Sequence, residues 1–185
     1  MNKYLSIIKL FKYPSASFRD SDGFYWITGR TDDLLNVSGH LLSTAEVESA
    51  LLNDKRISEV AAVPMPHAIK GQCICVYVVT KNGYKYDDSM ETDLRNLSNF
   101  VQIFVNKILL FPLLHSFQVR RTIGPVATPD LMLAVRGLPK TRSGKIIRRV
   151  LGKIARGEKD FGDISTITDE TIIDHLIEAR IAKSD

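Results

Sequence analysis

The sequence predicts an α+β fold, in which a small mixed β-sheet is flanked by helices and preceded by an N-terminal β-hairpin. Two observations lead to this prediction. Two runs of β-branched and apolar residues follow one amphipathic helix, and further helical patterns appear toward the C-terminus. The 185 residues suffice for one domain of ordinary size, or for a small domain with attached segments.

The predicted hairpin begins with an aromatic and β-branched run at 23–28, which follows turn residues at 20–23. Residues 29–33 read as the next turn, and an extended run resumes at 34–37. We therefore expect the runs at 23–28 and 34–37 to pair, and 38–40 to form a loop.

A capping box predicts the start of the first helix. Ser43 stands at the N-cap, and Glu46 follows three residues later, in position to reach back to it. Apolar residues at spacings of three and four continue the pattern, and the helix should end near Asn53.

The predicted sheet uses the runs at 57–63 and 72–80. Pro64 and Pro66 are expected to end the first strand, because proline cannot donate to a ladder of hydrogen bonds. A third, shorter strand is expected at 131–135.

The remaining segments alternate between polar, apolar and helical patterns. Residues 84–93 read as a loop, a helix should begin at Leu94, and 98–118 is an apolar stretch that reads as a buried helix or strand. Two amphipathic helices are expected near the C-terminus, one following Lys145 and one over about 168–181.

Composition describes a globular chain of mildly basic charge, with 44% hydrophobic residues and a net charge of +4. No run reaches the roughly 18 to 20 apolar residues of a membrane span. Lysines break the apolar run at the N-terminus, so we do not expect a secretion signal. Cys73 and Cys75 are expected to pack inside a strand in a reducing compartment, so we expect a cytoplasmic protein without a metal site. A nuclear location is also compatible with these features, and a mitochondrial one is less so.

The stretch 138–145 combines basic residues with features that shape a loop. Pro139 stiffens its entry, Gly144 permits a bend, and Lys145 provides a mobile positive charge, so the stretch suits an anion. It is not a Walker loop, because the glycine spacing is wrong and Ile146 stands where a metal-binding hydroxyl would be. A solvated basic loop remains the alternative.

Four motifs in register resemble the C-terminal part of AMP-forming acetyl-CoA synthetase, a member of the adenylate-forming acyl-CoA ligase superfamily. They are Trp-Ile-Thr-Gly-Arg-Thr-Asp-Asp at 26–33, Asn-Val-Ser-Gly-His at 36–40, Ser-Thr-Ala-Glu-Val-Glu at 43–48, and Pro-Lys-Thr-Arg-Ser-Gly-Lys-Ile at 139–146. The resemblance covers nearly everything from about Arg19 to the end. It implies a small C-terminal lid domain, which adopts a different orientation for each of two half-reactions.

The resemblance also implies a role for individual residues. Lys145 matches the catalytic lysine placed between the acetate carboxylate and the α-phosphate of ATP, Arg30 a nucleotide-binding arginine, and Asp32 the hinge of the lid. The residues that match the coenzyme A site are Ser38, Gly39, His40 and Arg120. Acetate, ATP and coenzyme A are the implied substrates, with Mg accompanying ATP and bound mainly by a large N-terminal domain.

Departures from the family pattern suggest how the chain is organised. Residues 1–18 lack the family's Thr-Gly-Asp motif, and 98–118 stands where relatives run on directly, so we interpret both stretches as non-family sequence in a partial gene product. Residues 19–31 are then the end of the large N-terminal domain, and 32–185 the lid domain. Leu41 replaces an arginine that many relatives direct at phosphate.

Three functions follow as hypotheses. The first is the lid of an acetate–CoA ligase, inactive alone because the ATP- and acetate-binding domain is missing. The second is a non-catalytic interaction or regulatory module that docks on a full-length synthetase. The third, nucleic-acid binding through 140–156, is disfavoured because no aromatic residues or nucleic-acid motif accompany the charge.

Overall fold

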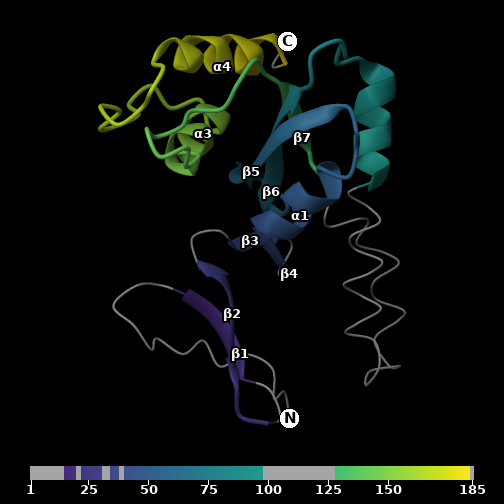
Figure 1. The fold of residues 1–185 in the computed structure, drawn as a ribbon, viewed down its shortest axis with the longest axis vertical. Helices are drawn as coiled ribbons and strands as arrows, with labels where there is room; N and C mark the ends of the chain where they lie inside the picture. The colour runs from purple at the N-terminus through teal and green to yellow at the C-terminus, as the bar shows by residue number, and fades with distance from the viewer. Residues whose placement is uncertain (1–14, 20–21, 31–33, 38–39, 98–127, 184–185) are drawn as a thin grey trace. The chain divides into compact units, whose positions relative to one another are not determined.

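The computed structural model describes residues 15–19, 22–30, 34–37, 40–97 and 128–183 (Figure 1). The chain divides into two compact units, residues 1–34 and 35–185. Of the predicted segments, 1–14 and 98–118 lie outside the described residues. Within the described part of the chain, no helix has the length and apolar character needed to cross a membrane.

The first unit contains a β-hairpin whose strands differ from those predicted. β1 (Ser15–Arg19) pairs antiparallel with β2 (Tyr25–Arg30), so that Phe18 lies opposite Trp26. The predicted pairing of 23–28 with 34–37 is therefore wrong. The sequence pattern identified β2 correctly, but it could not tell whether its partner precedes or follows it.

The run at 34–37 instead belongs to a second pair. β3 (Leu34–Val37) pairs with β4 (His40–Ser43), so the predicted loop at 38–40 is shorter than expected and His40 begins a strand. Leu35 and Val37 are fully buried in the core of the second unit. This burial explains why the run does not extend the first hairpin.

The second unit is built on a mixed three-stranded sheet, as predicted. Its order is β5 (Ile57–His67), β6 (Gly71–Thr80) and β7 (Leu131–Ala134); β5 and β6 are antiparallel, and β6 and β7 are parallel. Side chains of β6 alternate between two apolar clusters, because successive residues of a strand point to opposite faces. Both faces of this sheet are therefore buried.

β5 continues through Pro64 and Pro66, and the prediction that they end the strand is wrong. Within the described residues β5 pairs only with β6, so it is an edge strand. Ala62, Pro64 and Pro66 are spaced by two, so their nitrogens point to the same side, and the Ala62 N–H donates to the side chain of Glu48 rather than to β6. The prolines thus have their nitrogens on the free edge, where no donor is needed.

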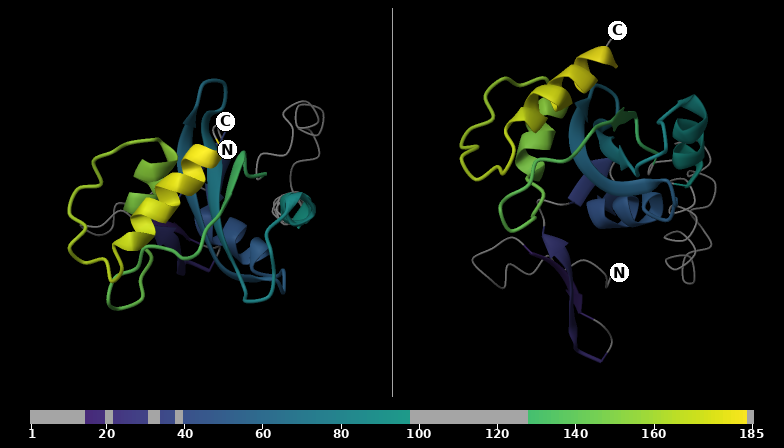
Figure 2. Two further views of the ribbon diagram at one scale, coloured as in Figure 1. Left: turned by 90° about the horizontal axis from the view of Figure 1, so that it is seen from above. Right: turned by 45° about the horizontal axis from the view of Figure 1, so that its top comes forward.

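Helices cover the two faces of the sheet (Figure 2). One face packs against α1 (Thr44–Leu51) and the helical residues 88–97, and the other against α3 (Arg148–Ala155) and α4 (Thr171–Ala182). α1, α3 and α4 contribute apolar side chains at the spacing that their sequences predicted. The cluster on the α3 and α4 side includes Val150, Leu151, Ile154, Ile173 and Leu176.

One prediction about helix capping and one about a helix start need correction. α1 begins after Ser43 as predicted, but the Ser43 side chain makes no capping hydrogen bond and Glu46 is exposed. The predicted loop at 84–93 already contains the start of the helix at 88–97, because Oδ1 of Asp87 accepts the Met90 N–H at 2.8 Å. Asp87 is thus the N-cap of this helix, and the polar stretch around it reads as a loop instead of as a helix start.

Candidate functional site

Residues 139–147, which we call the arm, form a tight hairpin that leads into α3. The Thr141 N–H donates to the Lys145 carbonyl at 2.9 Å, and the Gly144 N–H donates to the Thr141 carbonyl at 2.8 Å. A bridge pairs Lys140 with Ile146, and the Ile147 N–H donates to the Pro139 carbonyl at 2.8 Å. The arm is therefore held by its own backbone, in contrast to an unstructured basic loop.

Gly144 has the backbone conformation that the sequence predicted for a bend. Its φ is +80°, in the left-handed region, and a Cβ built at this position would meet nothing within 4 Å. A left-handed glycine that closes a short hairpin loop is the usual solution for a three-residue loop. The bend places Lys145 directly after it, with an exposed side chain.

The basic side chains between 140 and 156 fall into two groups: those that bond a described acceptor and those that do not. Five of the seven side chains bond an acceptor: Lys140 to Glu59, Arg148 to Glu48, Arg149 to the carbonyls of Phe161 and Asp163, Lys153 to the carbonyl of Asp160, and Arg156 to Glu158. Arg142 and Lys145 have no such bond to any described residue. The arm thus presents two positive charges that the described part of the fold does not use.

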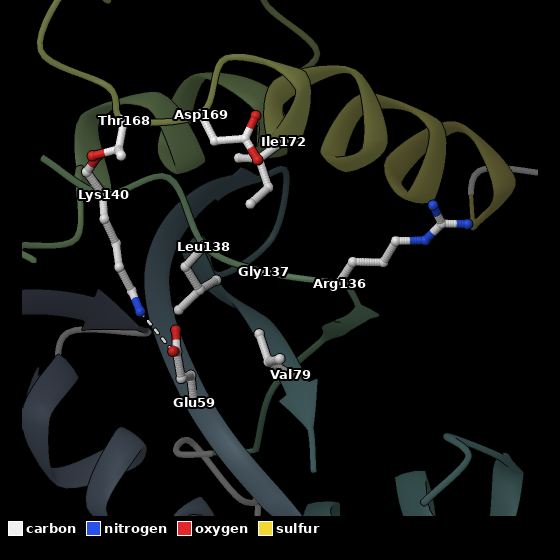
Figure 3. A pocket seen from close by; sticks show the side chains of 9 residues that line it. All are labelled: Glu59, Val79, Arg136, Gly137, Leu138, Lys140, Thr168, Asp169 and Ile172. Carbon is white, nitrogen blue, oxygen red and sulfur yellow. Dashed lines mark hydrogen bonds and ion pairs between the residues drawn. The ribbon is translucent and has the colours of Figure 1, made fainter. Parts of the chain in front are cut away.

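The entry of the arm is tied to the sheet and to the segment before α4. Nζ of Lys140 lies 2.6 Å from Oε1 of Glu59 on β5, and the Lys140 carbonyl accepts the Thr168 N–H at 3.0 Å (Figure 3). These residues line a shallow pocket of about 240 Å³ with Arg136, Gly137 and Ile172 among its walls. Lys140, although part of the basic run, therefore has a structural role.

The exit of the arm is tied to α1. Nη2 of Arg148 lies 3.1 Å from Oε1 and 2.9 Å from Oε2 of Glu48, and the same Oε1 accepts the Ala62 N–H at 2.9 Å. One carboxylate therefore joins α1, the edge of β5 and the first residue of α3.

Tyr77 connects β6 to α3. Its hydroxyl donates to the Leu151 carbonyl at 2.9 Å in the buried interior. Burial raises the pKa of Tyr77 well above its usual value, so the hydroxyl stays a donor at any physiological pH. The arm therefore leads into a helix that is anchored to the central strand of the sheet.

The structure describes only part of the predicted site. Arg30 is the last residue of β2 and His40 the first of β4, but the positions of their side chains are not described. Asp32, Ser38, Gly39 and Arg120 lie outside the described residues. Their predicted roles remain predictions, and Lys145 is the predicted site residue whose surroundings the structure defines.

Sequence reasoning missed the acidic partners of the arm. Glu48 and Glu59 lie 100 and 81 residues from the basic residues that they bind. Glu48 belongs to the motif at 43–48. Glu59 is a charged residue within the apolar run of β5, and this interruption could have indicated that it has a partner. Across the described ranges, no three or more His, Cys, Asp and Glu side chains gather in a way that could hold a metal ion.

Comparison with known families decides the class of this fold. Residues 46–111 match the family described as AMP-binding enzyme C-terminal domain. The chain carries an AMP-binding enzyme C-terminal domain. The match begins in α1 and includes β5, β6 and the helix at 88–97.

Curated relatives of this AMP-binding enzyme C-terminal domain are acetyl-coenzyme A synthetases. The chain is 49% identical to the enzyme of Beijerinckia indica over 178 residues, which is 91% of this chain and 24% of that protein. It is 48% identical to acetyl-coenzyme A synthetase 1 of Pseudomonas aeruginosa over 163 residues, covering 88% of this chain and 22% of that one. The chain thus spans about a quarter of the length of these relatives and matches their C-terminal part.

Solved structures share the fold of this chain. An anthranilate CoA ligase in complex with anthranoyl-AMP matches with a TM-score of 0.56 and 25% identity, covering 77% of this chain and 23% of that one. An acyl-CoA synthetase of Brucella canis matches with a TM-score of 0.50 and 27% identity, over 75% of this chain and 22% of that one. The small mixed sheet with flanking helices is therefore the fold of a domain found in adenylate-forming enzymes.

Proposed function

We propose that the chain is the C-terminal part of an acetate–CoA ligase, which makes acetyl-CoA from acetate, ATP and coenzyme A through an acetyl-adenylate. The identity to acetyl-coenzyme A synthetases supports this substrate class. The observation that carries the proposal is that the Lys145 side chain is exposed and has no described partner. It stands on an ordered arm, and no described residue neutralises its charge.

Lys145 serves the first half-reaction. When the acetate carboxylate attacks the α-phosphorus of ATP, negative charge builds between two groups that are already anionic. An ammonium group placed there opposes the repulsion and stabilises the transition state. At 4 Å the attraction between unit charges is about 1 kcal/mol in water but about 4 kcal/mol at an effective dielectric constant of about 20, so the effect requires a site from which water is largely excluded.

Such a site requires a second domain that binds ATP and acetate. The pocket beside the arm, of about 240 Å³, is already lined by the Lys140–Glu59 ion pair, and Lys145 is not among its lining residues. We therefore propose that the arm acts on substrates held by an N-terminal domain, and that these 185 residues assayed alone have little activity. Mg enters with ATP and is held mainly by that domain.

The same proposal assigns a role to each of the other predicted residues. Arg30 contacts the nucleotide, Asp32 is the hinge, and Ser38, Gly39, His40 and Arg120 approach coenzyme A after the lid has turned. The division of the chain after Leu34, close to Asp32, supports a hinge at this place.

Acetate-dependent exchange between ATP and pyrophosphate tests this function. The purified chain is assayed alone and mixed with the N-terminal domain of an acetyl-coenzyme A synthetase, in the presence of Mg. We expect activity only from the mixture, and a loss of about 100-fold or more in Lys145→Ala, which is the scale on which a single electrostatic group contributes.

Arg142→Ala is the matched control, because Arg142 is the other arm cation without a described partner. We expect it to change exchange less than about threefold, as a charge remote from the reacting atoms would. In contrast, coenzyme A-dependent release of AMP from preformed acetyl-adenylate should survive in Lys145→Ala. Activity of the chain alone, or equal losses in both variants, would contradict the proposal.

A further inference from the structure

The ion pair between Glu48 and Arg148 lies at the exit of the arm and differs from a surface pair. Glu48 is held in place by a second bond, since its Oε1 also accepts the Ala62 N–H at 2.9 Å. Its side chain is only 12% exposed, and Nη2 of Arg148 contacts both carboxylate oxygens. The carboxylate is therefore also held by a contact that does not involve Arg148.

Arg148 lies where the arm passes into α3. It is the first residue of α3, three residues after Lys145, and its N-terminal neighbour Ile147 provides no side-chain cap for the helix. The entry of the arm is held separately, by Lys140 on Glu59 and by Thr168. A hairpin fixed at both ends has little freedom to tilt at its tip.

We propose that Glu48 and Arg148 are positioning residues for Lys145, which hold the exit of the arm so that the lysine reaches the reacting carboxylate in a productive orientation. The inference rests on the proposed function of Lys145. Neither residue touches substrate; both act by fixing the backbone from which the lysine extends. Because misplacement by about 1 Å can cost on the order of 100-fold in rate, a loosened arm should lower turnover without abolishing the fold.

Single substitutions at Glu48 and Arg148, and a double-mutant cycle between Arg148 and Lys145, test the inference. All variants are made in the full chain and mixed with a synthetase N-terminal domain. Arg148→Gln removes the charge that Glu48 binds, and Glu48→Gln removes the carboxylate charge but keeps an oxygen for the Ala62 N–H. We expect each variant to lower acetate-dependent exchange by about 10- to 100-fold with little change in KM for ATP. Arg148→Lys, which keeps the charge, should recover part of the activity.

The decisive comparison uses the Lys145→Ala background. If Arg148 acts through Lys145, then adding Arg148→Gln to Lys145→Ala should lower the residual rate by less than about twofold. Amide hydrogen exchange provides a second readout: Gly144 and Ile147 should exchange faster in Arg148→Gln, whereas amides of β6 should not change.

The outcomes separate this inference from the proposed function. If Lys145→Ala has no effect in the otherwise unaltered chain, both fail. If Lys145→Ala lowers exchange but Arg148→Gln lowers it equally in both backgrounds, the ion pair contributes to stability alone and only this inference is overturned. Unchanged activity and unchanged amide exchange in Arg148→Gln would overturn it as well.

Discussion

The same substitution, glycine to alanine, should change the free energy of unfolding in opposite directions at Gly144 and at Gly152, which are only eight residues apart. Gly144 has a φ of +80° with open space around its missing Cβ, so an added methyl group meets no atom. The cost is therefore that of the backbone alone, about 1–2 kcal/mol for a left-handed residue with a Cβ. Asparagine, which tolerates this conformation better, should cost less.

Gly152 is in the interior of α3, where glycine is less favourable than alanine by about 1 kcal/mol. A Cβ there would lie 3.4 Å from Nη1 of Arg156, which is the end of a flexible side chain and can shift. We therefore expect Gly152→Ala to stabilise the chain by up to about 1 kcal/mol.

Urea denaturation followed by circular dichroism measures both changes, with the slope m as a check that the unfolded states are comparable. For a chain of this size, about 1 kcal/mol corresponds to a Tm shift of about 2–4 °C. A Gly144→Ala variant as stable as the parent, or a Gly152→Ala variant that is less stable, would refute the backbone argument. Gly144→Ala should also lower acetate-dependent exchange, because the bend sets the direction of the arm.

Other substitutions test the interior of the sheet. Tyr77→Phe removes the hydroxyl that donates to the Leu151 carbonyl, so urea denaturation should show a loss of about 1 kcal/mol, whereas Tyr84→Phe at a half-exposed position should show almost none. Leu176→Ala empties a fully buried position and should cost about 2–5 kcal/mol by the same measurement. Burial raises the pKa of the Cys75 thiol from its usual 9.0 to about 12, so the folded state keeps a proton that the unfolded thiol loses. Stability should therefore fall as pH rises from about 9 toward 12, and Cys75→Ala should flatten this decline; an unchanged alkaline slope would show that burial of the thiol is not its cause.

Local pattern predicted the elements of this fold, and tertiary context decided what the pattern left open. The runs at 57–63 and 72–80 became β5 and β6 because β-branched residues bounded by turns have few alternatives. The continuation of β5 through Pro64 depended on its place at the edge of the sheet, which no local window contains. The partner of β2 was missed for a similar reason, since either neighbouring segment could pair with it.

The candidate site shows the same division. The sequence predicted the bend at Gly144 and the exposed charge of Lys145, because both are local properties of the arm. It did not predict that Lys140 and Arg148 would be neutralised, since Glu48 and Glu59 come from distant parts of the chain. Which charges of a basic run remain available therefore depends on the packing of α1 and β5.

The outer edge of β5 also bears on the solubility of the chain. An exposed edge offers unpaired N–H groups to the strand of another molecule, which is a common route to aggregation. In β5, Pro64 and Pro66 have no N–H to offer, and the N–H of Ala62 already binds Glu48. Three successive outward positions are thus closed to a foreign strand, so Glu48→Ala should increase aggregation at high concentration even where the folded state persists.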